Sequence, residues 1–178
     1  MKKKITIALA ITLILSVGLL FADNPAPASF DVTTNVAGIN RLKITTAAFS
    51  GNPSQFDAAD AFTSLVIESA GAQTFSAYLS TLSNNRQGYT VSMGATAMTS
   101  EVSGQATSYI DYTVTVNGTS LETDGSTAVT EVTVIDQLPL TGLSSQSHQI
   151  SLSVDQESFD AAVQGSYTGT ITFEYEAK

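Results

Sequence analysis

Few residues of this chain could perform acid–base or nucleophilic chemistry. The sequence has 178 residues, a single histidine, His148, and no cysteine. A serine activated by His148 would need an acid beside the imidazole and a sharp turn to present the hydroxyl. No Gly-x-Ser-x-Gly motif occurs, and a zinc site needs three or four His, Cys or carboxylate ligands. We therefore predict no catalytic residue, no zinc site and no cofactor, with His148 on an exposed loop or strand.

Two groups of carboxylates lie close together in the sequence. Asp155, Glu157 and Asp160 fall within six residues, and Asp57 and Asp60 are three apart. A glycosidase needs two carboxylates that face each other across a cleft, which proximity on one loop does not supply. Calcium accepts oxygen ligands from flexible loops. Solvated loop charge is the preferred interpretation, and a calcium site is the alternative.

The tyrosines divide by their phase relative to neighbouring apolar residues. Tyr78 and Tyr109 are out of phase with their neighbours, so they are the candidate ligand-contact residues, because an exposed ring could stack on a sugar. The chain has no tryptophan, which makes a dedicated carbohydrate platform a weaker interpretation. The tyrosines in phase with apolar neighbours are expected in the core: Tyr89, Tyr112, Tyr167 and Tyr175.

The elements that must position these residues are predicted to be strands. Apolar side chains recur at every second position along most of the chain, which is typical of half-buried antiparallel strands. Residues 62–68 are expected to form a more fully buried strand. The alternating runs are residues 30–36, 75–79, 89–93, 110–116, 132–134, 150–154 and 167–175.

Turn residues separate the predicted strands. Asn117-Gly118 lies between two of them and is the strongest short-range hairpin signal, because both residue types tolerate positive φ. Asn117-Gly118-Thr119 also fits the N-glycosylation pattern, and we prefer the hairpin. Residues 55–61 and 156–163 could each form a turn or two of helix. We therefore predict an all-β fold: an antiparallel two-sheet β-sandwich with immunoglobulin-like Greek-key topology and eight or nine strands.

The first 22 residues have the order of a secretory signal peptide. Lysines fill positions 2–4, residues 5–20 are almost unbroken apolar, and Ala22 offers the small residue that a signal peptidase requires. We expect a signal-peptide helix over residues 1–22, cleavage after Ala22, and a single domain over residues 23–178. An uncleaved anchor helix is the alternative, since about 17–25 apolar residues span a membrane.

Removal of the signal peptide would leave a strongly acidic chain. Four basic residues then face 16 acidic ones, for a net charge of −12. Such a surface repels nucleic-acid phosphates and anionic membranes, so we expect neither nucleic-acid binding nor membrane insertion after cleavage. A domain of about 150 residues can bury roughly 68–70% of its unfolded surface, so it needs no disulfide.

Two pairs of segments carry a family pattern. SNNRQGYTVSM at residues 83–93 is followed by YIDYTV at residues 109–114, and SLSV at residues 151–154 is followed by GSYTGTITF at residues 165–173. They resemble the central hairpin and the closing strand pair of the secreted bacterial fimbrial-subunit and spore-coat-U-type β-sandwiches. The resemblance implies a non-enzymatic surface or assembly protein and transfers no functional site.

These observations favour a structural or assembly protein of the periplasm or bacterial cell surface, whose partners are proteins or further copies of itself. Residues 29–36 could be lent to a neighbouring copy as a donor strand, or could be the domain's own first strand. The alternative function is a monomeric extracellular binding module, an adhesin or carbohydrate-binding domain, with Tyr78 or Tyr109 contacting a glycan or host ligand.

Overall fold

The computed structural model describes residues 29–101, 106–126 and 130–178. The predicted signal-peptide helix and the cleavage site after Ala22 lie outside these residues. The chain divides into two units, Met1–Val36 and Ala37–Lys178, and the strands all lie in the second. No helix within the described ranges combines the length and the apolar character needed to cross a membrane.

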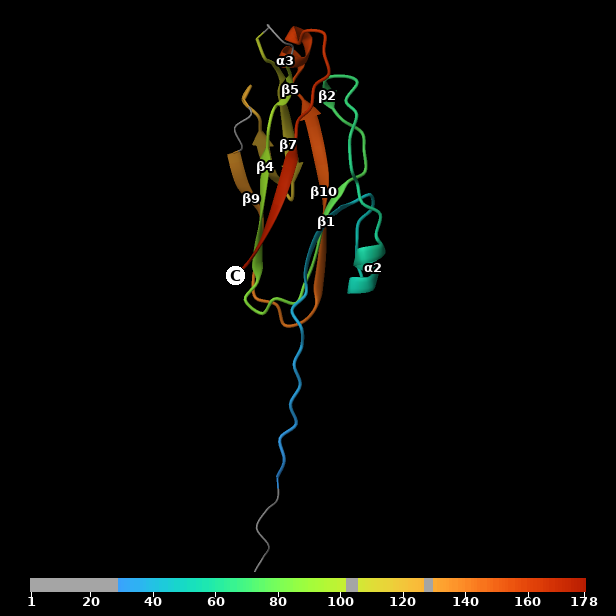
Figure 1. Cartoon of the computed structure of the whole chain (residues 1–178), viewed down its shortest axis with the longest axis vertical. Helices are drawn as coiled ribbons and strands as arrows, with labels where there is room; N and C mark the ends of the chain where they lie inside the picture. The colour runs from blue at the N-terminus through green and yellow to red at the C-terminus, as the bar shows by residue number, and fades with distance from the viewer. Residues whose placement is uncertain (1–28, 102–105, 127–129) are drawn as a thin grey trace, which may run out of the picture. The chain divides into compact units, whose positions relative to one another are not determined.

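The larger sheet has six antiparallel strands (Figure 1). Its members are β1 (Asn40–Thr45), β3 (Tyr78–Ser83), β10 (Ser144–Val154), β7 (Tyr112–Val116) and β8 (Thr119–Glu122), in that order, with β2 (Gly71–Ala72) also paired to β10. The long strand β10 holds this sheet together, because its first half pairs with β3 and its second half with β7 and β2.

The second sheet has three antiparallel strands in the order β11 (Ile171–Ala177), β4 (Tyr89–Ala95) and β9 (Thr130–Gln137). A short hairpin-like pair, β5 (Met98–Ser100) and β6 (Ser108–Ile110), forms a third sheet. One apolar core receives side chains from both larger sheets. The fold is therefore mostly β, antiparallel and sandwich-like, which confirms the predicted class at this level.

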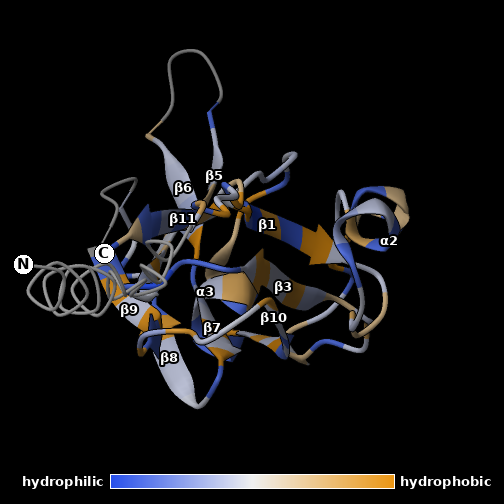
Figure 2. Cartoon of the chain, turned by 90° about the horizontal axis from the view of Figure 1, so that it is seen from below, coloured by the Kyte–Doolittle hydropathy of each residue, from blue (hydrophilic) through white to orange (hydrophobic). Residues whose placement is uncertain are grey.

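The alternation of apolar and polar residues reflects burial against this core. Ile110, Tyr112, Val114 and Val116 are all buried, while the intervening residues are not. Apolar and polar segments alternate along the strands in the hydropathy view (Figure 2). Tyr89 and Tyr112 are buried as predicted, whereas Tyr167 and Tyr175 are only half-buried.

The predicted hairpin at Asn117-Gly118 is confirmed. It joins β7 to β8, and both residues have positive φ, 51° and 77°. Asn117 Nδ2 donates a hydrogen bond to the Val134 carbonyl on β9, 2.8 Å away. The turn residue that fixes the hairpin therefore also connects the two sheets along this side.

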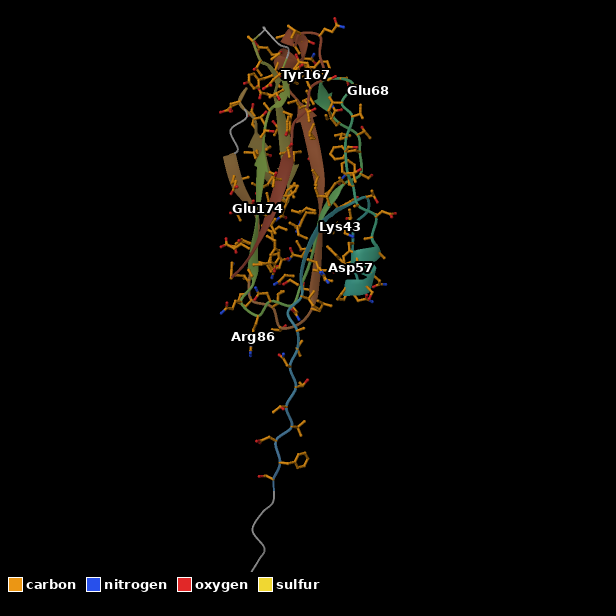
Figure 3. All side chains as sticks on the ribbon, in the orientation of Figure 1. Lys43, Asp57, Glu68, Arg86, Tyr167 and Glu174 are labelled. Carbon is orange, nitrogen blue, oxygen red and sulfur yellow. The ribbon has the colours of Figure 1, made fainter. Side chains whose placement is uncertain are left out.

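The domain has two ends that matter below (Figure 3). The turn from β3 into β4, which carries Asn84 and Arg86, lies at one end, which we call the Asn84 end. Helix α3 (Gln156–Ala161) lies at the other, near Tyr167 and Glu68, and we call it the α3 end. Helix α3 agrees with the prediction of a short helix in residues 156–163.

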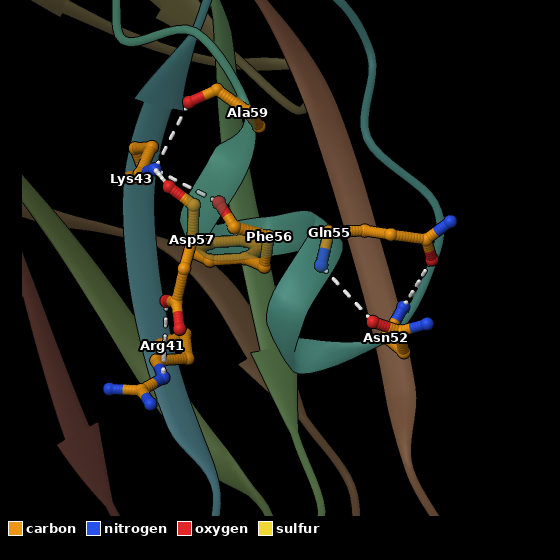
Figure 4. Close-up of polar contacts among 7 residues, drawn as sticks. All are labelled: Arg41, Lys43, Asn52, Gln55, Phe56, Asp57 and Ala59. Carbon is orange, nitrogen blue, oxygen red and sulfur yellow. Dashed lines mark hydrogen bonds and ion pairs between the residues drawn. The ribbon is translucent and has the colours of Figure 1, made fainter.

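The outer face of β1 and β3 is covered by residues 46–60, which include helix α2 (Pro53–Ala58) (Figure 4). Asn52 caps the start of this helix, and Lys43 Nζ donates to the carbonyls of Phe56, Asp57 and Ala59 at 2.9–3.1 Å. The Phe56 ring is 1% exposed and packs edge-on against Phe49. This layer buries Ser80 and Leu82, the outward-facing side chains of β3.

Two of the predicted strands are wrong. Residues 62–68 form no strand, and only three of their apolar side chains are even half-buried. Residues 29–36 form no strand either, and all of their side chains are exposed. Residues 29–36 are therefore not the first strand of the domain.

Candidate functional site

The domain has an apolar groove between two segments. Residues 62–67 form one wall, and residues 165–173, which lead into β11, form the other. The volume of the groove is about 940 Å³. Core residues form its floor: Ala77, Ile110, Tyr112, Ile150 and Leu152. The groove is a part of the core that the described strands leave uncovered, because buried positions of the six-stranded sheet and half-buried positions of β11 face into it.

One wall of the groove is the edge strand β11 and the chain just before it. Strand β11 pairs with β4 on one edge only, and within the described residues no strand pairs with its other edge. Ile171 and Phe173 point to the core side yet stay half-buried. The residues before β11 extend this wall, and they are held to β5, since Thr168 and Thr99 exchange two backbone hydrogen bonds of 3.0 Å. An unpaired strand edge beside exposed core positions is a template for another strand.

The other wall is the segment that was predicted to be a buried strand. Phe62 N–H donates to the Ile44 carbonyl at 2.9 Å, and its ring lies 5.7 Å from that of Phe75. Beyond Phe62, residues 63–68 form no hydrogen bond with any other described residue. Native backbone groups are nearly always paired with protein or water. The N–H and C=O groups of residues 63–68 therefore bond to water unless another chain pairs with them.

The groove is closed at one end and open at the other. Toward the Asn84 end, the Tyr175 hydroxyl of β11 donates to Asn40 Oδ1 of β1 at 2.8 Å and lies 3.1 Å from Ser83 Oγ. The Tyr175 ring also stacks on Tyr89, with centroids 4.7 Å apart. These contacts join the two edge strands directly. Toward the α3 end no such bridge lies between the described edges, and Val66 and Val163 line an open mouth.

Helix α3 borders that mouth and is firmly held. Asp155 caps the helix by accepting a 2.8 Å hydrogen bond from Ser158 N–H, and this bond lowers the pKa of its carboxyl. Asp155 N–H donates to the Asp111 carbonyl, and Asp111 N–H donates to Ser158 Oγ. Phe159 and Ala162 then face the groove. Asp155 is thus a structural cap in this arrangement.

Residues 29–36 form the segment of the other unit that the structure describes, and we call it the N-terminal segment. Phe30, Val32 and Val36 are 86%, 85% and 77% exposed. They alternate with Asp31, Thr33 and Asn35, so in an extended conformation one face would be apolar and the other polar. The sequence pattern predicted a strand here; the residues form none, and their apolar side chains are exposed.

The two tyrosines that the sequence singled out for ligand contact lie in different sheets. Tyr78 lies on β3 of the six-stranded sheet and Tyr109 on β6 of the small sheet, and both are half-buried. His148 lies on β10, as a strand residue, and partial burial lowers the pKa of its imidazole. Among the described residues, no three His, Cys, Asp or Glu side chains form a group able to hold a metal ion.

The groove itself was missed at the sequence level. Its walls come from residues 62–67 and 165–173, about a hundred positions apart in the chain, and no local motif marks their meeting. The signal that could have pointed to it was the presence of two strand-like apolar segments, residues 30–36 and 62–68, with no evident partner for either.

Comparison with protein-family models, with curated proteins and with solved structures finds no match to this chain.

Proposed function

We propose that this chain is a non-enzymatic subunit of a surface assembly, in which the N-terminal segment of one copy fills the groove of another. A single observation carries the proposal. The chain has an amphipathic strand-forming segment with no cover, and a domain with an apolar groove beside an unpaired strand edge. In strand addition, backbone hydrogen bonds supply affinity and pockets for alternate side chains supply specificity.

The two parts match in length and in chemistry. Eight extended residues span about 26 Å at 3.3 Å per residue, comparable to the run of residues 165–173 along one groove wall. Burial of a Phe or Val side chain stabilises by about 1.5–3 kcal/mol. Phe30, Val32 and Val36 together would therefore contribute several kcal/mol (before the cost of ordering the segment), and pairing with β11 would add backbone hydrogen bonds.

We infer that the domain has immunoglobulin-like Greek-key topology. The unpaired edge of β11 beside the apolar groove supports a position for one further strand at this edge. The lysines at positions 2–4 and the apolar run after them support export to the periplasm or cell surface. Mass spectrometry of the exported protein should then find Asp23 at the N-terminus. Membrane-bound protein that retains residues 1–4 would contradict export with cleavage.

A matched pair of substitutions in the N-terminal segment tests the assembly. Val32→Asp places a charge on the apolar face, whereas Thr33→Asp places the same charge on the polar face. We expect Thr33→Asp and the unmodified protein to form ladders of high-mass bands in unheated samples, and Val32→Asp to run as a monomer. Ladders that persist with Val32→Asp, or an unmodified protein that stays monomeric, would contradict donation of this segment.

The alternative, a monomeric binding module, makes a different prediction. An unmodified protein that stays monomeric and is retained on a glycan array, with loss of retention on Tyr78→Ala or Tyr109→Ala, would support that function instead. Tyr78 and Tyr109 lie in different sheets and are both half-buried, whereas the groove and the N-terminal segment match in length and chemistry, and for this reason assembly is the function we propose.

A further inference from the structure

The Asn84 end of the domain fixes the point where the N-terminal segment leaves it. Asn84 Oδ1 accepts a 2.7 Å hydrogen bond from Ile39 N–H, and Asn84 Nδ2 donates a 2.9 Å bond to the Ala37 carbonyl. Consecutive Cα atoms are 3.8 Å apart, so Val36, the residue before Ala37, must also start from this end of the domain. A donated segment would therefore bring its own domain, Asn84 end first, against the domain that receives it.

The closed end of the groove determines which end of the receiving domain it meets. The bond between Tyr175 and Asn40 blocks passage toward the Asn84 end, while the mouth at Val66 and Val163 is open. The end of the segment that is attached to a whole domain must emerge at the open mouth. The segment would then run antiparallel to β11, with Val36 at the mouth and Phe30 toward Phe173.

The surfaces that would meet are apolar on both sides. At the Asn84 end, the loop from β9 to β10 exposes Leu138 and Leu143, 70% and 46% of their surface. At the mouth, Val66 and Val163 are 77% and 53% exposed. Exposed apolar side chains that gather at one place mark contact surfaces more often than scattered ones do.

The two ends differ in charge, because the Asn84 end has basic residues beside the acidic Asp136 and Glu176, whereas the α3 end has acidic residues and, among the described residues, no basic one. The four basic residues after position 22 are Arg41, Lys43, Arg86 and Lys178. None of them lies at the α3 end, where Glu68, Glu157 and Asp160 are exposed. At the Asn84 end, Lys178 pairs with Asp136, whereas Arg86 is exposed and forms no ion pair with any described residue.

We propose a second contact between copies: the Asn84 end of the donor sits on the α3 end of the receiver, with Leu138 and Leu143 on Val66 and Val163 and Arg86 facing the acidic residues. This contact rests on the proposed function. In addition to strand donation, this second contact would set the angle between successive copies. Its loss would leave strand donation in place.

The absence of cysteine from the chain makes the contact directly testable by cross-linking. Exported chains carrying Leu143→Cys and Val163→Cys are mixed, allowed to assemble and treated with a short bismaleimide. We expect a cross-linked dimer that survives heating, and no such dimer when Ser120→Cys on β8 replaces Val163→Cys. A second arm uses charge: Arg86→Glu should slow assembly roughly tenfold, and Arg86→Lys should restore it, because rim charges act mainly on association rate.

The outcomes separate the two proposals. Heat-labile ladders in every variant, with cross-linking no higher than the Ser120→Cys control and unchanged assembly of Arg86→Glu, would overturn the second contact and leave strand donation standing. Absence of ladders in all variants, the unmodified chain included, would overturn both.

Discussion

The two sides of the sandwich-like domain close in different ways. On the side of β8 and β9, which we call the closed side, the Asn117 side chain bonds across to β9, and Leu121 and Val134 are 6% and 3% exposed. On the side of β1 and β11, which we call the open side, the bond between Tyr175 and Asn40 is the only hydrogen bond between these two edges in the described part of the chain, and the groove opens beyond it.

The proposed donated strand would account for this difference. The closed side completes its core with its own hairpin, and Leu121 and Val134 are buried there. The open side has core residues that line the groove, the unpaired edge of β11, and residues 63–68, which have no hydrogen bond with other described residues. In the proposed assembly, a donated strand would lie between them. The uncovered apolar segment elsewhere in the same chain is what makes self-assembly the natural interpretation.

The largest expected effect is a charge in the completed core. Val114 is fully buried between the sheets, so Val114→Asp should destabilise by several kcal/mol or prevent folding, because an unpaired charge is buried. Thr113→Asp on the opposite face of β7 is the control and should fold. Urea unfolding followed by circular dichroism measures both, and equal tolerance of the two changes would contradict the assigned register.

The next effect compares the two sides directly. Leu121→Ala on the closed side should cost about 2–5 kcal/mol, because it leaves a cavity in a packed core. Val66→Ala on the open side should change the stability of the monomer by less than about 0.5 kcal/mol, since the side chain is already exposed. Denaturant midpoints measure both values. Similar losses at the two positions would mean that the open side is packed like the closed one.

An alkaline titration probes the floor of the groove. Burial raises the pKa of Tyr112 from 10.0 to about 12, and burial also raises the pKa of Tyr89. A raised folded-state pKa gives stability that is fully present below pH 10 and is lost as the pH rises toward 12, roughly 3 kcal/mol for Tyr112. Tyr112→Phe should flatten this decline, leaving the part due to Tyr89. Identical pH profiles for the two proteins would contradict a buried Tyr112.

The smallest effect concerns the closed end of the groove. Tyr175→Phe removes the hydroxyl that bonds Asn40 and should cost about 0.5–1.5 kcal/mol, the net value of one hydrogen bond. Asn40→Ala should cost a similar amount, and the double variant should cost less than the sum of the two, because both changes remove the same bond. Additive losses would show that the two side chains do not act together.

The sequence predicted the closed side better than the open side, and the reason is physical. Asn117-Gly118 between two alternating runs specifies a hairpin through local backbone conformation, and Ile110 to Val116 specify which face is buried. Period-two alternation shows that a segment has an apolar face, yet it does not show what covers that face. Residues 30–36 have this alternation and residues 62–68 have a short apolar run, and on these patterns both are predicted as strands although neither forms one.

The candidate site escaped prediction for a related reason. The walls of the groove come from residues 62–67 and 165–173, which are distant in the chain, and no local sequence pattern shows that two such segments will lie beside each other. Tyr78 was predicted to be accessible because it is out of phase with Leu79, but residues 46–60 cover the outer face of β3. The alternation of apolar and polar residues along a strand does not show whether a second layer of chain covers the sheet.

Hydrogen exchange at β11 tests strand donation most directly. The full exported chain carrying Val32→Asp, which cannot donate its own segment, is mixed with a synthetic peptide of residues 29–36. We predict that the peptide slows amide exchange across Ile171–Ala177 and raises the unfolding temperature, while β9 on the closed side is unchanged and a peptide carrying Val32→Asp has no effect. Exchange at β11 that is indifferent to the unmodified peptide would contradict the assignment of the groove as a strand acceptor.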